Sequence, residues 1–574
     1  MSSSTPILAV ADALDVLRAK YSEMLDDVAR GERVLWIGAG VSRKQVPDVE
    51  SLLSRVLTFL RDKIDLSATP DVHREALESI IRVHLPDELD DFLSNPTCWK
   101  VPPDLSSLVN VYSTILGTEV GLEAQDYLLW EAVDVRETYG NPGIAPGPEH
   151  WLIAFLVHEG VVQEAVTTNW DGLIEHAVRT SSIDEDPEKV SVLLSQESFR
   201  LGRARFKLYK AHGCAVLARA DETYRQYLVA QTFDINTWRD NPIFTSMVDK
   251  LRELAKNRES LMLGTSFQDS NLLGRIASAT QDLRWPWNPD DPSCIFAEPQ
   301  ITPIHREALK LVYRDDYFAN RVEICDRSAA GMFSGALLGA ATLHILLEKL
   351  SIGLAYAPSF ATSGDVVSDL EGGIEAIKTM LAADAGDSVE RVVELIRDGI
   401  SPLVLRFFEP TTELAHTKYK AIYDQPVKAG VDAQFRHLGI PELSVALGLL
   451  GVGLLRDYWT LSLGTGGAIA SGVFEVTSRV GGSPPWRLVI TRDWAETDAM
   501  KATDMWITDP GHLLVVQALG DRPRAVTRGP AGGLGSGRRR PSPESRRVTW
   551  LSDLESHSGD TDELAATFRA EVSA

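Results

Sequence analysis

Cysteine is scarce in this chain of 574 residues, which has only Cys98, Cys214, Cys294 and Cys325. They lie far apart in the sequence and form no Cys-x-x-Cys pair, which argues against a structural zinc ribbon and a disulfide framework. We therefore expect no metal site. The N-terminal residues also lack the basic segment and apolar core of a secretory signal, which favours a cytoplasmic protein without membrane association.

Positive charge is also in deficit, with 57 Lys and Arg residues against 81 Asp and Glu residues and a net charge of −24. This balance disfavours binding of nucleic acid or an anionic membrane through the bulk surface, although a local basic patch remains compatible with it. The arginine run Arg538–Arg540 is such a patch, within a stretch rich in Pro, Gly and Ser. We interpret 521–547 as a flexible linker or loop and expect no direct nucleic-acid binding, with contact to nucleic acid as the alternative.

Long apolar runs are few. Ala329–Leu347 is uncharged and has glycines at four-residue spacing, a pattern that packs helices closely in membranes and in soluble cores alike. We favour a soluble helix, because charged residues follow at once, and a membrane span is the alternative. Leu443–Leu455 is too short to span a membrane.

The clearest local signal is the sequence RVLWIGAGVS at Arg33–Ser42. Its apolar part predicts a buried strand, and Gly38, Ala39 and Gly40 then predict a tight turn that leads to Ser42. Glycines let the backbone approach a ligand closely, and a helix N-terminus offers N–H groups to a phosphate. The third glycine of a dinucleotide fingerprint is missing, because Arg43 stands in its place.

A second strand is predicted at Ala165–Thr168, and it runs into the turn Asn169-Trp170-Asp171-Gly172. Polar residues at the carboxyl end of a parallel strand lie where open α/β sheets bind ligands. The alternative is that Asn169 and Asp171 only cap the turn and the next helix.

A third strand, Phe206–Ala211, ends at His212-Gly213. A lone histidine is more often structural than catalytic. At a strand end followed by glycine, however, the imidazole of His212 can be accessible, and its ordinary pKa suits proton transfer near neutral pH.

A fourth strand, Leu261–Leu263, leads into the small-residue turn Gly264-Thr265-Ser266, with Asp269 shortly after it. Such a turn can present hydroxyl and N–H donors to a phosphate or a ribose. A plain strand-to-helix turn would account for the same residues.

Two further apolar runs, Cys294–Ala297 and Val322–Cys325, would bring the sheet to six strands. Helical segments separate several of the strands, so we predict an α/β fold with a doubly wound, Rossmann-like parallel sheet. Residues 6–30 have the spacing of one amphipathic helix. Residues 43–135 are predicted to form a helical insertion that caps the edge of the sheet. The first domain would span 1–350.

The second half is predicted to be an α+β domain at 351–520, followed after the linker by a strand–helix segment at 548–574. Its expected helices are Val366–Leu381, Ser388–Ile396 and Ser444–Leu455, and its expected strands are Trp486–Ile490, Met505–Ile507 and His512–Leu519. We recognise no catalytic constellation after residue 350, which favours partner binding or oligomerisation.

The four strand-end motifs, in this order, resemble the SIR2 family. The family pattern is Gly-Ala-Gly-x-Ser, then Thr-x-Asn-x-Asp, then His-Gly, then Gly-x-Ser, and here it stands as Gly38–Ser42, Thr167–Asp171, His212-Gly213 and Gly264–Ser266. The resemblance covers roughly the first 350 residues. The Thr-Thr-Asn-Trp-Asp form and Asp269 make the chain look closer to bacterial SIR2-like effectors of antiphage defence than to protein deacetylases.

The resemblance implies NAD as substrate and a role for each motif. The Gly38–Ser42 loop, with Thr168, Gly264, Thr265, Ser266 and Asp269, would bind NAD. Asn169 would orient the nicotinamide ribose or the attacking water, Asp171 would hold the cofactor or Asn169, and His212 would act as general base. Water as acceptor would give nicotinamide and ADP-ribose.

Departures from the family pattern bear on the reaction. Sirtuin deacetylases carry a four-cysteine zinc module, which this chain lacks, and that counts against deacetylation. The resemblance to the SIR2-like effectors therefore implies an NAD glycohydrolase that depletes NAD on phage infection. The alternatives are an NAD or ADP-ribose sensor without turnover, and a deacylase or ADP-ribosyltransferase. By the same resemblance, control would come through the second half, a homo-oligomer, or a partner such as a HerA-type ATPase, an Argonaute or a phage protein.

Overall fold

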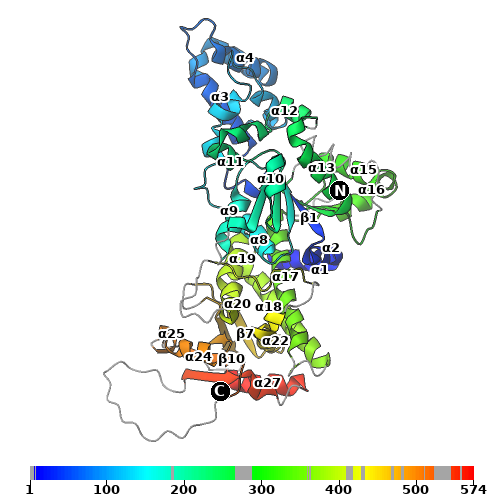
Figure 1. The fold of residues 1–574 in the computed structure, drawn as a ribbon, viewed down its shortest axis with the longest axis vertical. Coiled ribbons are helices and arrows are strands. Elements are labelled where there is room, and N and C mark those ends of the chain that lie inside the picture. The colour runs from blue at the N-terminus through cyan, green and yellow to red at the C-terminus, as the bar shows by residue number, and fades with distance from the viewer. Residues whose placement is uncertain are drawn as a thin grey trace, which may run out of the picture.

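The structure is a computed structural model (Figure 1). It describes residues 6, 8–182, 187–238, 240–265, 287–357, 360, 364–408, 418–427, 433–466, 471–479, 484–507, 509, 511–522, 545–555 and 559–573. The predicted site residues Ser266 and Asp269, and most of the predicted linker 521–547, lie outside the described residues.

A six-stranded parallel sheet forms the centre of the first half. Its strands are β1 (Arg33–Ile37), β2 (Glu164–Thr167), β3 (Val190–Leu193), β4 (Phe206–Lys210), β5 (Glu259–Leu263) and β6 (Cys294–Phe296), in the spatial order β3-β4-β2-β1-β5-β6. All five residues of β1 are buried, as expected for a parallel sheet with both faces covered. Leu35 packs into one core and Trp36 into the other, so the sheet separates two cores. The predicted α/β class with a doubly wound sheet is confirmed.

Two of the predicted strands are wrong. Val322–Cys325 lies inside helix α16 (Asp315–Ser328), and Met505–Ile507 lies inside helix α25 (Asp504–Ile507). Apolar runs of three or four residues fit one turn of a helix as well as a short strand, so periodicity cannot separate the two. The edge strand β3 was not predicted from the sequence.

The predicted single helix at 6–30 is two helices, α1 (Val10–Lys20) and α2 (Ser22–Arg30). The break falls at Tyr21, whose backbone is not helical (φ −134°, ψ 33°) and whose hydroxyl donates to the carbonyl of Ala329 at 2.5 Å. Both helices lie beside the sheet near α17 (Ser334–Gly353), as Figure 1 shows. Tyr21 therefore ties the N-terminal pair to the segment that leads into α17.

The other helices of the first half flank the sheet. They are α8 (Pro148–His158), α9 (Leu173–Ser181), α10 (Gln196–Leu201), α11 (Ala215–Ala220), α12 (Thr232–Thr237), α13 (Thr245–Asn257) and α15 (Pro303–Tyr313). Each of α9 and α11 begins directly after one of the predicted motif turns. The start of each helix is therefore set by the same turn that ends the preceding strand.

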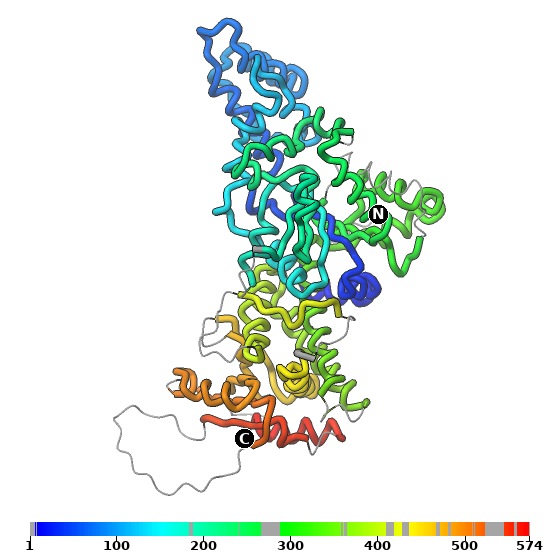
Figure 2. Tube along the Cα trace, in the orientation of Figure 1, coloured from blue at the N-terminus to red at the C-terminus, as the bar shows by residue number. Residues whose placement is uncertain are grey.

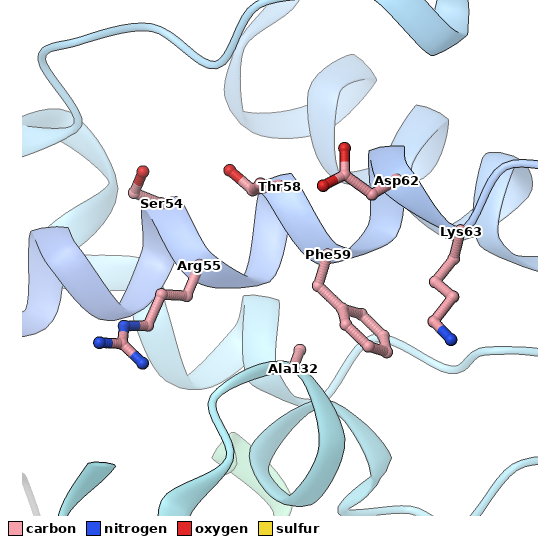
Figure 3. Close-up of a pocket in the computed structure, with 7 residues that line it drawn as sticks. All are labelled: Ser54, Arg55, Thr58, Phe59, Asp62, Lys63 and Ala132. Atoms are coloured by element: carbon pink, nitrogen blue, oxygen red, sulfur yellow. The ribbon is translucent and has the colours of Figure 1, made fainter. Parts of the chain in front are cut away.

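The chain between β1 and β2 is mainly helical, and Figure 1 shows α3 and α4 projecting from the sheet, away from the second half. Its helices are α3 (Val49–Asp62), α4 (Val72–His84), α5 (Leu89–Ser94), α6 (Tyr112–Leu116) and α7 (Val135–Thr138), around their own core. A surface hollow of about 320 Å³ lies along α3. In Figure 3, Phe59 and Lys63 point from α3 towards the segment with Ala132, whereas Thr58 points to the other side of the helix.

The second half contains a mixed five-stranded sheet. Its strands are β7 (Trp459–Leu463), β8 (Phe474–Ser478), β9 (Trp486–Thr491), β10 (His512–Gln517) and β11 (Arg546–Trp550), in the order β11-β10-β9-β8-β7. The pairs β7–β8 and β8–β9 are antiparallel, and β9–β10 and β10–β11 are parallel. Strand β11 follows the predicted linker and pairs with β10, so residues on both sides of that linker build one sheet.

Helices pack on this sheet and connect it to the first half (Figure 2). They are α18 (Gly364–Ala385), α19 (Val389–Glu394), α20 (Ser401–Phe408), α21 (Ala433–His437), α22 (Ile440–Leu455), α24 (Trp494–Lys501), α25, α26 (Leu551–Leu554) and α27 (Thr561–Ser573). One continuous core runs from α1 through α17 and α18 to α22. The predicted domain boundaries at 350, 520 and 547 stay predictions.

Helix α17 extends into a helical stretch that is long and apolar enough to span a membrane, at Ser334–Tyr356. Within the fold, 78% of its most apolar 18-residue window is buried. The helix packs against α1, α8 and α18. Such burial is typical of a core helix and is consistent with a soluble protein.

A buried ion pair of the first half lies where that half contacts residues 419–423 of the second half. Lys349 of α17 and Glu159 at the end of α8 are both fully buried, with Nζ 2.7 Å from Glu159 Oε2. The ammonium also donates to the carbonyl of Tyr423, while Glu159 Oε1 accepts from the hydroxyl of Tyr419 and the amide of Ile422. Burial lowers the pKa of Lys349, and the Glu159 carboxylate opposes that effect. The charges are thus compensated by each other and by the 419–423 segment.

We predict that Lys349→Met lowers the free energy of unfolding by about 3–5 kcal/mol, because it leaves the Glu159 carboxylate buried without its counter-ion. The matched control is Lys310→Met, which removes a partly exposed pair with Glu307 and should cost less than about 1 kcal/mol. Urea unfolding followed by fluorescence measures both. Equal losses in the two variants would contradict the structural role of the buried pair.

Candidate functional site

Strand register brings the predicted motifs together. Ile37 of β1 pairs with Thr167 of β2 and with Leu263 of β5, and Thr167 pairs with Lys210 of β4. The four strands therefore end at the same level, and the motifs lie together at the carboxyl edge of the sheet. Open α/β sheets bind ligands at this edge. A cavity of about 470 Å³ lies there. All predicted site residues that the structure describes line it: Gly38, Ala39, Gly40, Ser42, Thr168, Asn169, Asp171, His212, Gly264 and Thr265.

Two glycine turns form the floor of this cavity by direct backbone contact. The amide of Gly40 donates to the carbonyl of Gly264 at 3.0 Å. A Cβ on Gly40 would lie 2.7 Å from the Cα of Gly264, which itself has a left-handed backbone (φ +58°). Any side chain at either position would push the two turns apart.

Asn169 is held by two polar contacts to the first turn. Its Nδ2 donates to the carbonyl of Gly38 at 3.1 Å and to the Ser42 hydroxyl oxygen at 3.2 Å. These contacts fix the orientation of the amide, so that Oδ1 is the remaining acceptor. The side chain is 8% exposed, which limits the positions from which a ligand can reach it.

His150 lies behind Ser42 and was not predicted from the sequence. It belongs to the first turn of α8, is fully buried, and its Nδ1 accepts a hydrogen bond from the amide of Gly147 at 3.0 Å. Its Nε2, 3.0 Å from Ser42 Oγ, therefore carries the ring proton and donates to that oxygen. Burial lowers the pKa of His150 and so favours the neutral ring, whereas the Asp171 carboxylate opposes this effect.

The Ser42 oxygen thus accepts from both His150 and Asn169. A serine hydroxyl has two acceptor lone pairs and one donor hydrogen. With both lone pairs in use, its hydrogen remains for a third partner. The pair of contacts orients Ser42 as a donor at the edge of the cavity.

Asp171 has a largely structural environment. Its Oδ1 accepts from the amide of Leu173 at the start of α9, and its carbonyl accepts from the buried ammonium of Lys210. The capping role considered from the sequence therefore exists, and the residue also lines the cavity.

His212 lies at the end of β4 and is 7% exposed, with its side chain lining the cavity. Its carbonyl accepts from the amide of Val229 at 3.2 Å. The next residue, Gly213, has a left-handed backbone (φ +86°). His212 therefore lies in the cavity wall together with the residues of the other motifs.

Three buried polar atoms of lining residues have no hydrogen-bond partner within the described part of the chain. They are Asn169 Oδ1, Trp170 Nε1 and Thr265 Oγ1. Buried polar groups are paired in most proteins, so such a group is informative. All three atoms belong to residues that line this one cavity.

The side chains at the mouth of the cavity come from the start of the helical insertion. Arg43 and Asp48 line it and are exposed, and Val46 and Leu52 line it and are buried. The insertion therefore covers the carboxyl edge of the sheet. Arg43, which replaces the third glycine of a dinucleotide fingerprint, brings a guanidinium group to the site.

A group of carboxylates outside the cavity has the proximity of metal ligands. Oxygens of Asp27, Glu259 and Asp291 lie within 4.8 Å of one another. The guanidinium of Arg33, however, is ion-paired with all three. Burial raises the pKa of Glu259 to about 8, with Arg33 opposing the rise. The arginine already occupies the position of a cation, so the cluster is an ion-pair network.

The family comparison agrees with the geometry. Residues 163–289 match the SIR2-like domain. The matched stretch begins just before β2 and includes Asn169, His212 and Gly264, and it supports membership of the SIR2 family. SIR2-like domains bind NAD, so NAD-related chemistry is expected of this site. No curated protein matches the chain.

Two residues were not predicted from the sequence: Tyr139, which lines the cavity, and His150, which contacts the lining residue Ser42. Tyr139 follows the last helix of the insertion, and its hydroxyl donates to the carbonyl of Pro47 at 2.8 Å. Its ring contacts Trp170 edge to face. Neither Tyr139 nor His150 lies in a recognisable motif; the only local signal is the Gly147-Pro148 pair that opens α8.

We predict that Gly40→Ala lowers stability by about 1–3 kcal/mol, because the new methyl group must displace the backbone of Gly264. Gly364→Ala is the control, since nothing lies within 4 Å of a Cβ there and the change should stay within about 0.5 kcal/mol. Thermal unfolding and NAD binding measured on both variants test this. An unchanged Gly40→Ala protein would show that the two turns do not need their close contact.

Proposed function

We propose that this protein is an NAD glycohydrolase, which cleaves NAD to nicotinamide and ADP-ribose. The observation that carries the proposal is the arrangement of Asn169 and His212 in one cavity beside the paired glycine turns. This combination provides an acceptor, a base and a backbone floor within a buried volume. The SIR2-like match at 163–289 supports NAD as the substrate.

The residues present fit the substrate. The close contact between Gly40 and Gly264 leaves backbone at the floor, where a bulky dinucleotide can approach. Thr265 Oγ1 and the Ser42 hydroxyl are available to ribose or phosphate oxygens. The guanidinium of Arg43 at the mouth of the cavity suits the negative charge of the diphosphate.

Cleavage of the bond between the ribose C1′ and the nicotinamide nitrogen develops positive charge on the ribose. The electron pair of that bond leaves with nicotinamide. Asn169 Oδ1 is an oriented oxygen dipole, because its amide group is fixed by Gly38 and Ser42. We propose that it stabilises the developing charge or positions the attacking water.

Water then completes the reaction. Its oxygen forms the new bond to C1′, and its proton passes to His212, which releases it to solvent afterwards. The sum is NAD⁺ and water giving nicotinamide, ADP-ribose and a proton. Deacylation is disfavoured, because the four dispersed cysteines cannot form the zinc module of sirtuin deacetylases. A sensor that binds NAD without turnover is the outcome if binding occurs and cleavage does not.

We further propose that the enzyme is a cytoplasmic defence effector that depletes NAD during phage infection. Control would come through the second half, through homo-oligomerisation, or through a partner such as a HerA-type ATPase, an Argonaute or a phage protein. Helix α8 supports this proposal, because His150 near its start contacts Ser42 and Glu159 at its end contacts the second half.

We predict that Asn169→Ala and His212→Ala each lower NAD turnover by about 10²–10⁴-fold, because one removes the oriented dipole and the other the base. His84→Ala, at the end of α4 and away from the cavity lining, is the matched control and should keep the wild-type rate. Chromatographic assay of nicotinamide release measures all three. Wild-type turnover in either of the first two variants would refute the assigned roles.

We predict that His150→Phe lowers NAD turnover by about 10–100-fold, because Ser42 loses the hydrogen bond from His150 and Asn169, which donates to Ser42, shifts with it. His150→Gln retains a side-chain N–H that can reach Ser42 and should recover part of the rate. If His150 had only a structural role, His150→Phe and His150→Gln would lose thermal stability equally, and His150→Gln would recover no turnover. Equal turnover by the two variants would exclude the positioning role.

A further inference from the structure

A second cavity of about 250 Å³ lies behind the catalytic turns. Its walls come from α9 and α11, the helices that follow the Asp171 and His212 turns, together with Val192 of β3 and the 139–144 loop. Tyr139 lines both cavities. The two cavities are therefore separated by the turns that carry Asn169 and His212.

Glu175 gives this second cavity an unusual polar group. The side chain is 4% exposed, lines the cavity and pairs through Oε1 with Lys210 Nζ at 3.1 Å. Its Oε2 is buried without a hydrogen-bond partner among the described residues. A buried carboxylate oxygen without a donor is costly unless a ligand supplies one.

The remaining lining restricts the class of ligand. Leu173, Val216 and Leu217 make the walls largely apolar, which suits the face of a flat ring. Lys210 already compensates the charge of Glu175, so a neutral N–H donor fits better than a second cation. Arg179 lines the cavity and is exposed, where it can meet an anionic group.

We propose that this cavity binds a mononucleotide with an amino-bearing base. The amino group donates to Glu175 Oε2, the base lies between the apolar walls, and the phosphate contacts Arg179. The volume of about 250 Å³ accommodates a base with its ribose. Neither the motifs nor the SIR2-like match assigns a ligand to these residues.

Binding there reaches the NAD cavity through Lys210. The same ammonium that pairs with Glu175 also donates to the carbonyl of Asp171. A ligand that engages Glu175 therefore alters a contact of the Asn169–Asp171 turn. This regulatory consequence rests on the proposed NAD cleavage, whereas the binding itself does not.

The test compares cytidine monophosphate with the analogue that lacks its 4-amino group, by calorimetry on the full chain. We expect the first to bind at least about tenfold more tightly, as expected for a hydrogen bond to a charged group. In Glu175→Gln, the amide NH2 group can take the position of Oε2. It cannot accept from the 4-amino group, so this preference should disappear. Asn169→Ala should leave cytidine monophosphate binding unchanged, which separates this cavity from the NAD cavity.

Two further variants keep the proposal falsifiable. Leu217→Trp should fill the cavity and abolish binding, and the exposed Arg179→Ala should weaken cytidine monophosphate but not cytidine. Equal binding of the two monophosphates, no binding of either, or a preference that survives Glu175→Gln would each overturn the proposal. A preference with no NAD cleavage would leave the binding site intact and refute only the proposed enzymatic function.

Discussion

Helix α8 is the element on which both the site and the joint between the halves depend. His150 near its first residue donates to Ser42, and Glu159 at its last turn is paired with Lys349. They are nine positions apart in the chain, which corresponds to a rise of about 13.5 Å along a helix. The side chains of His150 and Glu159 are buried and hydrogen-bonded or ion-paired. A shift of the helix at one end would therefore weaken the interactions at the other. The Gly38–Ser42 turn and the second half are thus connected through α8.

The sheet provides the other constraint. Strand register places the ends of β1, β2, β4 and β5 at one level, and each strand then continues into a turn made of small or polar residues. The site needs no long loop for its assembly, because parallel pairing alone aligns Gly38, Thr168 and Gly264. Residues of the helical insertion near Val46 complete the cavity wall over the carboxyl edge of the sheet.

Sequence reasoning could predict what is local and periodic. Strands β1, β2, β4, β5 and β6, the glycine turns and the motifs with Asn169 and His212 follow from short-range patterns, and the structure brings the motif residues into one cavity. Val322–Cys325 was wrong because one helical turn and a short strand share the same apolar pattern. His150, Tyr139 and Glu175 could not be found in this way, since their roles come from contacts with residues distant in sequence.

The most direct test of the central claim is to incubate the purified chain with NAD, alone and with lysate from phage-infected cells, and to resolve the products by chromatography. The account predicts equal amounts of nicotinamide and free ADP-ribose. Dependence on the lysate would locate control outside the cavity. NAD that remains intact in both conditions, although it binds, would contradict the claim that Asn169 and His212 act as a hydrolytic pair.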